Sequence, residues 1–383
     1  MRALCCGDSH IGAGRDLAPD RLHEQEQLWR TVLELARTEN VDAVLHAGDM
    51  WERRKPSPDE YLAAERPLVE HRDAGGCPVL VCAGNHDRAG VDDNLALRVL
   101  EQAGLILLST EPEVIPLPMS DTIRICTLPW TPVSRLVAVE GCGDRDRIHE
   151  TAAELLIATA RGLRERANGP AILVLHWSVG GAALPSGLPI EMAREVILPI
   201  EELVDLGFDQ IVAAHIHKKQ YIDKTDERRG FYVGSPMPLN FGEAKDAHGV
   251  WLLEVGPEGF VSSTFRTLES RRFVTVDVGV GPNRFVFSSI GIDVRDAFVK
   301  FQGVAGDEDL AAVRSYFVDE LGAARVQFDL TVERPARARV EGLSEDLGAV
   351  DALAAYLAAI GVNGSVGAAL IQRTQGYLER TGA

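Results

Sequence analysis

The chain has 383 residues and contains no apolar run long enough to cross a bilayer. Its first residues form a strand-like segment, and no charged leader, long apolar stretch or cleavage signal precedes them. These absences argue against a secreted or membrane-inserted protein. They predict a cytoplasmic protein with no membrane partner.

Cysteine is scarce and is not arranged as a metal or redox motif. Six cysteines occur, and none of them forms a C-x-x-C pair. Most of them lie in apolar, strand-like runs; the six are Cys5, Cys6, Cys77, Cys82, Cys126 and Cys142. We therefore predict small buried side chains in a reducing compartment.

Positive charge is in deficit, with a formal net charge of -18 at pH 7 and a pI near 5.0. This argues against a polycation that binds DNA through its overall field. It does not exclude a nuclease, because two divalent cations would add positive charge where a phosphate must lie. Two basic clusters, Arg53-Arg54-Lys55 and Lys218-Lys219, adjoin candidate ligand segments. For both, a solvated surface and a functional contact remain equally open.

Hydrophobic residues make up 46% of the chain, enough for a large core and more than one domain. Residues 1–110 alternate short apolar runs with helical spacing, which predicts a layered α/β arrangement. The expected strands there are 3–6, 41–47 and 79–82, and the expected helices are 21–39, 59–72 and one from Asp92 or Asp93 to Gln102.

Strands dominate the next part of the chain, which suggests a second sheet packed on the first. The expected strands are 113–117, 122–128, 171–175, 208–213, 219–223, 231–233, 250–255 and 260–266, with a helix at 145–167 and a loop at 179–189. We predict an α/β fold, a two-sheet sandwich flanked by helices, over residues 1–270.

The strand pattern weakens at 268–284, where Gly279, Gly281 and Pro282 indicate a boundary. Beyond it, a strand at 296–304, a helix at 307–321 and a strand at 325–333 predict a small α/β domain over 284–345. Helices at 350–360 and 366–380 predict a helical C-terminal segment, 346–383.

Five segments carry oxygen and imidazole donors, and several of them follow strand-like runs. They are Asp8-Ser9-His10, Gly48-Asp49, Gly84-Asn85-His86-Asp87, His176 and His215-Ile216-His217. Each alone is ordinarily a turn, a helix cap or a structural histidine. Their combination in this order predicts a dinuclear metal centre that hydrolyses phosphate esters, because two cations about 3.5–4 Å apart activate water and stabilise charge on phosphorus.

Within this set, Asp49 is the natural bridging ligand, because a carboxylate has two charged oxygens. Asp8 and His10 are two residues apart; in an extended segment both would lie on one face, and a strand-end turn could aim both at one ion. His215 and His217 have the same spacing.

Asn85 offers a neutral amide oxygen, and His176 completes the second ion's ligands. Imidazole and carboxylate together suit manganese, iron or zinc, and the residues do not choose among them. His86 directly follows a ligand and is the candidate catalytic acid, with Asp87 orienting its ring and keeping it cationic. His46, on the strand before Asp49, is expected to be structural.

These motifs resemble those of the calcineurin-like metallophosphoesterases, and within that superfamily the SbcD-type nucleases of double-strand-break repair. Three further features favour that branch. They are Gly48-Asp49-Met50-Trp51 followed by Pro56-Ser57-Pro58, Gly234-Ser235-Pro236 followed by Asn240-Phe241-Gly242-Glu243, and Glu333-Arg334-Pro335 followed by Arg339-Val340 and Gly342-Leu343-Ser344. One departure is Ala214, where the family usually has glycine before its H-x-H.

The resemblance implies that Asp8, His10, Asp49 and His217 bind one manganese ion and that Asp49, Asn85, His176 and His215 bind the other. It implies His86 as the catalytic histidine, double-strand exonuclease activity, and endonuclease activity on single strands or hairpins. It also implies that 284–345 caps DNA, that helices near 59–72 and 92–103 form a homodimer, and that an SbcC-type coiled-coil ATPase binds near the C-terminus.

Two alternatives remain at this stage. One is a phosphodiesterase or phosphatase for a small molecule such as a nucleotide, and the other is a non-catalytic scaffold. The complete ligand set and His86 argue against a scaffold. The region after residue 284 separates the nuclease from the small-molecule enzyme, because a nuclease needs a second surface to bracket a duplex.

Overall fold

The computed structural model describes the chain except for residues 89–95, 117–122, 139–146, 194, 281–284, 288–292, 306–309, 333–346, 363 and 382–383. Two compact units make up the chain. The first comprises Met1–Val276, Ser289–Phe301 and Ala311–Phe328, and the second comprises Asp277–Ser288, Gln302–Leu310 and Asp329–Ala383.

The first unit contains a six-stranded sheet in the order β14-β13-β1-β2-β3-β4. Its strands are β14 (Gly259–Thr267), β13 (Gly249–Gly256), β1 (Arg2–Cys6), β2 (Ala43–His46), β3 (Val79–Cys82) and β4 (Leu107–Ser109). Strands β1 to β4 run parallel, and β13 runs antiparallel to β1. The carboxyl ends of β1, β2 and β3 therefore lie at one edge of the sheet.

A second six-stranded sheet has the order β11-β12-β10-β7-β6-β5. Its strands are β11 (Gln220–Tyr221), β12 (Phe231–Tyr232), β10 (Gln210–Ala214), β7 (Ala171–His176), β6 (Arg124–Leu128) and β5 (Glu113–Pro116). Strands β6, β7, β10 and β12 run parallel. The carboxyl ends of β7 and β10 are thus adjacent.

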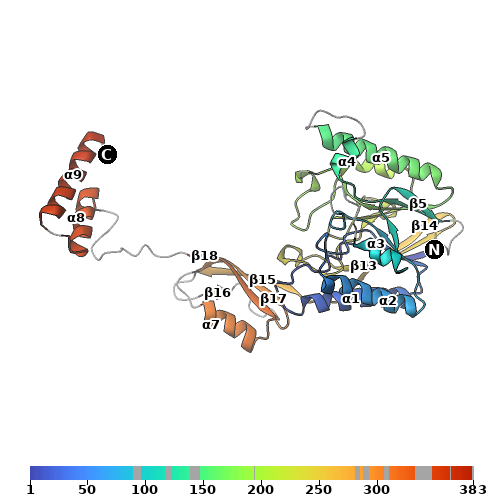
Figure 1. The fold of residues 1–383 in the computed structure, drawn as a ribbon, viewed down its shortest axis with the longest axis horizontal. Helices are drawn as coiled ribbons and strands as arrows, with labels where there is room; N and C mark the ends of the chain where they lie inside the picture. Colours follow the sequence, from blue (N-terminus) through green and yellow to red (C-terminus); the bar gives the residue numbers. More distant parts are fainter. Residues whose placement is uncertain are drawn as a thin grey trace. The chain divides into compact units, whose positions relative to one another are not determined.

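The inner strands β1, β3 and β7 are almost continuous apolar runs because both of their faces are covered. In β1, Ala3 and Cys5 pack in the core between the two sheets, whereas Leu4 and Cys6 face helices α1 (Arg21–Thr38) and α2 (Pro58–Asp73). The outer face of the second sheet is covered by α5 (Ile148–Arg166). Figure 1 shows α1 and α2 on one side of this unit and α5 on the other. The predicted two-sheet α/β sandwich flanked by helices is confirmed.

Short elements connect these layers. They are α3 (Leu97–Gln102), α4 (Val133–Ala138), β8 (Ser178–Val179), the 3-10 turn Ile190–Met192, β9 (Ile197–Leu198), α6 (Ile200–Val204) and the 3-10 turns Glu227–Arg229 and Phe241–Glu243. Strands β8 and β9 pair around the segment that the sequence predicts as a plain loop. They bring residue 195 back to the sheet edge where β7 and β10 end.

A third sheet of four strands has the order β16-β15-β17-β18. Its strands are β16 (Phe285–Phe287), β15 (Phe273–Val280), β17 (Phe298–Ala305) and β18 (Arg325–Val332). The segment 268–284, where the strand pattern of the sequence weakens, contains β15. Val276 and Val278 are buried and Asp277 between them is exposed, an alternation that marks a strand although glycines follow it.

Within the described residues, the predicted helix at 307–321 consists of α7 (Leu310–Ser315) and a π-helical turn over Tyr316–Glu320. The C-terminal helices are α8 (Ala349–Ala359) and α9 (Ser365–Thr381). Cys142, Asp92, Asp93, Gly281, Pro282 and the motif residues from Glu333 to Ser344 lie outside the described residues. Among the helices that the structure describes, none combines the length and apolar character that a membrane span requires.

Candidate metal centre

All the predicted ligands lie where parallel strands end. Asp8 and His10 follow β1, Asp49 follows β2, Asn85 follows β3, His176 is the last residue of β7, and His215 and His217 follow β10. The loops of the two sheets meet at this edge. The backbone N–H of His215 donates to Asp8 Oδ1 (3.0 Å), and Ala47 O lies 2.8 Å from His176 Nδ1.

The backbone turns sharply as it delivers these side chains. Asp8, His10, Asp49 and His215 have φ values of 48°, 41°, 57° and 89°, in the left-handed region that residues other than glycine rarely adopt. Of the two arrangements expected for Asp8 and His10, an extended segment and a strand-end turn, the structure has the turn. Hydrogen bonds from Asp8 N to Gly48 O (2.8 Å) and from His10 N to Asp49 O (3.0 Å) hold it. Such concentrated backbone strain is typical of functional sites.

Glycines allow the loops to approach one another this closely. A Cβ atom on Gly48 would lie 2.4 Å from His176 Nδ1, and one on Gly84 would lie 2.2 Å from Asp49 Oδ1. Ala214, the departure from the family pattern, is tolerated because it faces Gly7. A Cβ on Gly7 would lie 3.0 Å from the Ala214 methyl group.

The donor atoms form three groups, and within each group the ligand atoms lie within 4.8 Å of one another. The groups are Asp8, His10 and His217; His10, Asp49 and His86; and Asp49, His176 and His215. Asp49 Oδ2 lies 3.5 Å from His10 Nε2 and 3.2 Å from His176 Nε2. A carboxylate oxygen between the first and the last group is what a bridging ligand requires.

The surroundings of Asn85 and His10 indicate that this set of donors suits a cation. Asn85 Oδ1 lies 3.0 Å from His176 Nε2 and 2.9 Å from His215 Nδ1, so one amide oxygen faces two ring nitrogens. His10 Nε2 is buried and has no hydrogen-bond partner among the described residues. An unsatisfied buried nitrogen aimed at carboxylates fits a metal ligand better than a structural histidine. All the donors are oxygen or nitrogen atoms, which suits manganese, iron or zinc.

Three glutamates that the sequence analysis missed as site residues stand behind the histidines. Glu52 Oε2 is 2.9 Å from His10 Nδ1, Glu195 Oε2 is 2.9 Å from His215 Nε2, and Glu243 Oε1 is 2.9 Å from His217 Nδ1. A carboxylate at one ring nitrogen fixes the tautomer and turns the other nitrogen towards the centre. Glu243 belongs to a motif quoted above, but no local signal marks Glu195, which β8 and β9 bring to His215.

His86 lies beside this group, and its ring is held by a backbone carbonyl. His86 Nδ1 donates to Glu52 O (2.6 Å), which leaves Nε2 available to a substrate. The prediction that Asp87 orients this ring is wrong. The buried Asp87 carboxylate instead accepts hydrogen bonds from Asp49 N (2.8 Å), Met50 N (3.0 Å) and Gly84 N (2.9 Å). Asp87 thus joins the loop after β2 to the loop after β3.

Comparison with known proteins identifies the family. Residues 1–219, more than half of the chain, match the model of the calcineurin-like phosphoesterases. The chain belongs to this family. The phosphoesterase is 26% identical over 268 residues to the SbcD subunit of the nuclease SbcCD from Bacillus subtilis, covering 67% of each chain.

Two further relatives have related names. The SbcD subunit of the Escherichia coli nuclease SbcCD is 25% identical, over 66% of this phosphoesterase and 64% of the relative. The DNA double-strand break repair protein Mre11 of Haloferax volcanii is 28% identical, over 83% of this chain and 65% of that protein. The chain thus spans about two thirds of the length of these relatives.

The electrostatics of the phosphoesterase centre couple its histidines to its carboxylates. Burial opposes the protonated form of His176, but Asp49 outweighs it and raises the pKa of His176 to about 9. Burial likewise opposes the charge of His217, whereas Glu243 and Asp8 raise its pKa to about 9. Against burial, His176 and His10 hold the pKa of Asp49 below its ordinary range. A cation that binds here therefore competes with protons for the same atoms.

His46 supports the loops and is no ligand. Its Nε2 lies 2.8 Å from Ser9 Oγ, and its Nδ1 accepts a hydrogen bond from Gly48 N (3.3 Å). Burial lowers the pKa of His46 to about 3, so the ring is neutral. His46 thus fastens the Asp8 loop to the Asp49 loop.

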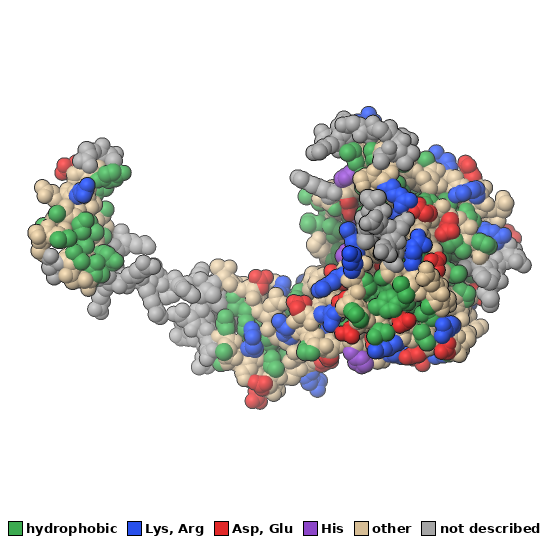
Figure 2. Space-filling view, viewed as in Figure 1, with side chains coloured by type: hydrophobic (Ala, Val, Ile, Leu, Met, Phe, Trp, Pro, Cys, Tyr) green, Lys and Arg blue, Asp and Glu red, His purple; other side chains and the backbone are tan. Residues whose placement is uncertain are grey.

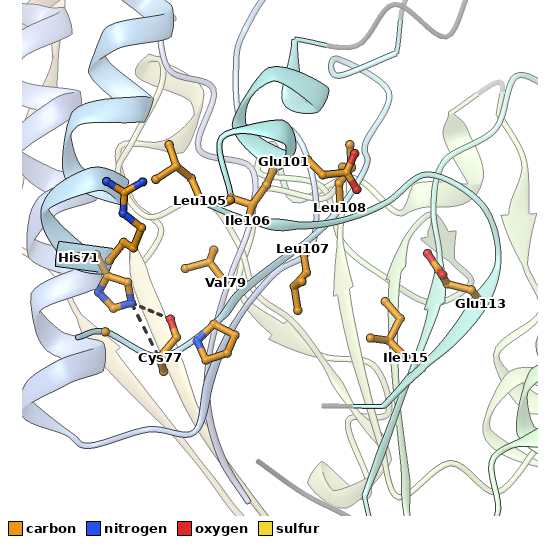
Figure 3. Close-up of a pocket in the computed structure, with 14 residues that line it drawn as sticks. His71, Cys77, Val79, Glu101, Leu105, Ile106, Leu107, Leu108, Glu113 and Ile115 are labelled. Atoms are coloured by element: carbon orange, nitrogen blue, oxygen red, sulfur yellow. Dashed lines mark hydrogen bonds between the residues drawn. The ribbon is translucent and has the colours of Figure 1, made fainter. Parts of the chain in front are cut away.

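A pocket of about 550 Å³ lies elsewhere in the phosphoesterase and contains none of the predicted ligands. It is lined by residues at the start of β3 and β4 and at the ends of α2 and α3, among them His71, Val79 and Leu107 (Figure 3). The ligands follow the carboxyl ends of the strands, so this pocket lies at the other end of β3. His71 Nε2 contacts Cys77 O (2.9 Å) and is engaged within the fold.

Proposed function

We propose that this phosphoesterase is a metal-dependent nuclease that hydrolyses phosphodiester bonds in DNA. The observation that carries the proposal is the convergence of seven oxygen and nitrogen donor residues, Asp49 and six others, with His86 beside them. The names of the relatives, two nuclease subunits and a DNA repair protein, support DNA as the substrate.

The residues would hold two divalent cations, for which we propose manganese. Asp8, His10, Asp49 and His217 would bind one, and Asp49, Asn85, His176 and His215 would bind the other. When bound, such a pair lowers the pKa of a water molecule and offsets the charge of the phosphate. Asp49, whose oxygen lies between His10 and His176, would contribute to both sites.

His86 would donate a proton to the leaving oxygen or hydrogen-bond a phosphate oxygen. Its Nδ1–H is fixed on the Glu52 carbonyl, so Nε2 is the ring atom that would transfer a proton. The backbone N–H of His86 also donates to Asp49 Oδ1 (2.7 Å), which ties the ring's position to the bridging carboxylate. Asp87 would act by positioning, since it holds the Asp49 loop.

The finer proposals follow the same resemblance. They are double-strand exonuclease activity, endonuclease activity on single strands or hairpins, a capping role for 284–345, and a homodimer formed through α2 and the helix ending at Gln102. An SbcC-type coiled-coil ATPase would bind segment 346–383. Exposed apolar side chains on or beside α8 and α9 support a docking role: Tyr356 (41% exposed), Ile360 (50%), Val366 (61%), Leu370 (43%) and Tyr377 (61%).

End-labelled linear duplex DNA tests the proposal. With manganese, the purified full chain should shorten the duplex, and a chelator should stop the reaction. Cyclic nucleotides and mononucleotides are offered in parallel, because a small-molecule phosphodiesterase would prefer them. Activity confined to those small substrates would contradict the DNA nuclease.

A further inference from the structure

Arg53, Arg54 and Lys55 form an exposed basic strip directly beside the proposed metal centre. The residue before the strip, Glu52, contacts His10 through its carboxylate and His86 through its carbonyl. The strip therefore begins one residue away from two groups of the centre. Arg53 is four residues beyond Asp49, a backbone distance of at most about 14 Å.

The backbone is fixed on both sides of the strip. Before it, Trp51 forms a bridge with Ile11, and its indole N–H donates to Glu60 O (2.9 Å). After it, Ser57 caps α2 through reciprocal hydrogen bonds with Glu60. Fixed ends limit the conformations open to the cations, which reduces the entropy lost when they bind an anion.

Other cations that closely follow the ligand segments are already engaged. Arg15 pairs with Glu60 (3.0 Å), Arg88 is buried against Glu111 (3.4 Å), Lys218 pairs with Asp246 (2.9 Å), and Lys219 lies over the Phe265 ring (4.8 Å). The three cations of the basic strip form no ion pair with any residue that the structure describes.

We propose that the basic strip binds the DNA phosphate backbone next to the bond that is cut. The inference depends on the proposed nuclease function and assigns its backbone contact. With a net charge of -18, the overall field repels DNA, so attraction must come from local cations. Figure 2 shows Lys and Arg interspersed with Asp and Glu over the visible face. Such charges are screened beyond about 10 Å at 0.1 M salt, so cations beside the centre dominate.

Binding of a fluorescent duplex between 50 and 200 mM salt tests the strip in the full chain. Two proteins are compared, one with the basic strip intact and one with the strip neutralised. Both carry His86→Ala so that the duplex is not cut during the titration. Each phosphate contact contributes about 0.9 to the slope of log K against log salt. Arg53→Gln/Arg54→Gln/Lys55→Gln should therefore weaken binding at least tenfold at the lowest salt and reduce the slope by about 2–3.

Two control variants separate charge from folding. Arg53→Lys/Arg54→Lys/Lys55→Arg should keep the salt slope, because binding to DNA phosphates requires positive charge and not the planar geometry of a guanidinium group. Arg228→Gln/Arg229→Gln removes an exposed pair that is already engaged with Asp226 and should leave the slope unchanged. Arg54→Gln alone should remove about a third of the effect, which keeps the test valid if the triple variant folds poorly.

The outcomes distinguish the two proposals. The nuclease function is wrong if the His86→Ala protein does not bind duplex and the protein with His86 intact does not cut it. If the His86→Ala protein binds duplex and the triple variant has the same affinity and the same salt slope, only the proposal for the basic strip is wrong. The strip is then a solvated surface. With His86 restored, the ratio of duplex hydrolysis to bis(p-nitrophenyl) phosphate hydrolysis should fall at least tenfold in the triple variant.

Discussion

At the scale of single residues, Asp49 lies at the centre of the site. Its Oδ2 lies near ring nitrogens of His10 and His176, and its Oδ1 accepts the His86 N–H. Three residues with different proposed roles therefore contact one carboxylate. The assignment of His86 as acid can be separated from metal binding, because its ring is held by Glu52 and not by a ligand.

His86→Ala should retain both metal equivalents and lose hydrolysis by at least about 100-fold, the lower end for general acid catalysis. The variant removes the Nε2 proton but leaves the backbone N–H that donates to Asp49. Steady-state kinetics on duplex DNA and metal analysis measure the two effects. Activity within about tenfold of the wild type, or about 1.4 kcal/mol in barrier, would contradict the role.

Glu195→Gln should weaken metal binding about 10- to 100-fold, because the carboxylate behind His215 orients the ring. Burial opposes ionisation, but His215 and Ser178 hold the pKa of Glu195 below its ordinary value, so the carboxylate is charged. Calorimetric titration with manganese measures the change, and the melting temperature of the metal-free protein should stay close to wild type.

Glu191→Gln is the matched control for Glu195, because Glu191 lies in the same segment and accepts a hydrogen bond from Gly181 N (2.7 Å) rather than from a candidate ligand. It should leave metal affinity unaltered. Equal metal affinities in both variants and the wild type would mean that Glu195 has no positioning role.

At the scale of elements, the site is an assembly of strand-end loops that depends on glycine for close contact. Gly84→Ala would place a Cβ 2.2 Å from Asp49 Oδ1, so it should displace the Asp49 carboxylate and abolish binding of at least one metal ion. Metal analysis after dialysis against manganese checks this.

Gly162→Ala, in helix α5, provides the contrast, because nothing lies within 4 Å of the position that its new methyl group would occupy. It should stabilise the protein by about 0.5–1 kcal/mol through helix propensity. Denaturant unfolding measures this change. A Gly84→Ala protein that binds metal normally would show that the loops are not closely packed there.

Elements that depend on a local sequence pattern are predictable, whereas contacts between segments far apart in the sequence are not. Strands β1, β2, β3 and β7 are predictable within two or three residues because each is a buried apolar run with a ligand motif at its end. Strand β15 is missed because later glycines mask its alternation. Glu195 cannot be found from sequence, since its contact with His215 exists only once β8 and β9 fold back.

The role of Asp87 is misassigned from sequence for a related reason. Adjacency along the chain suggests a contact with the His86 ring, but the chain turns between them. The carboxylate faces backbone amides of two neighbouring loops, an arrangement that depends on tertiary structure.

At the scale of the whole molecule, metal binding and stability should depend on pH in opposite ways. His176 and His217 have pKa values raised to about 9. In the metal-free protein, their stabilising contribution is fully present below pH about 6.5 and is lost as pH rises through 9. Manganese must displace these protons, so its affinity should rise over the same range.

Thermal melts at pH 6.5, 7.5 and 8.5, each with manganese and with a chelator, measure both trends. The chelated protein should melt at a lower temperature as pH rises, and the gap between the two samples should widen. A gap that narrows with pH would contradict the proton competition at His176 and His217.

The most direct test of the paired-metal centre is an anomalous difference map from a crystal soaked in manganese. We expect two peaks, one on each side of the Asp49 carboxylate, with Asp8, His10 and His217 near one and Asn85, His176 and His215 near the other. A single peak, or peaks away from Asp49, would contradict the account.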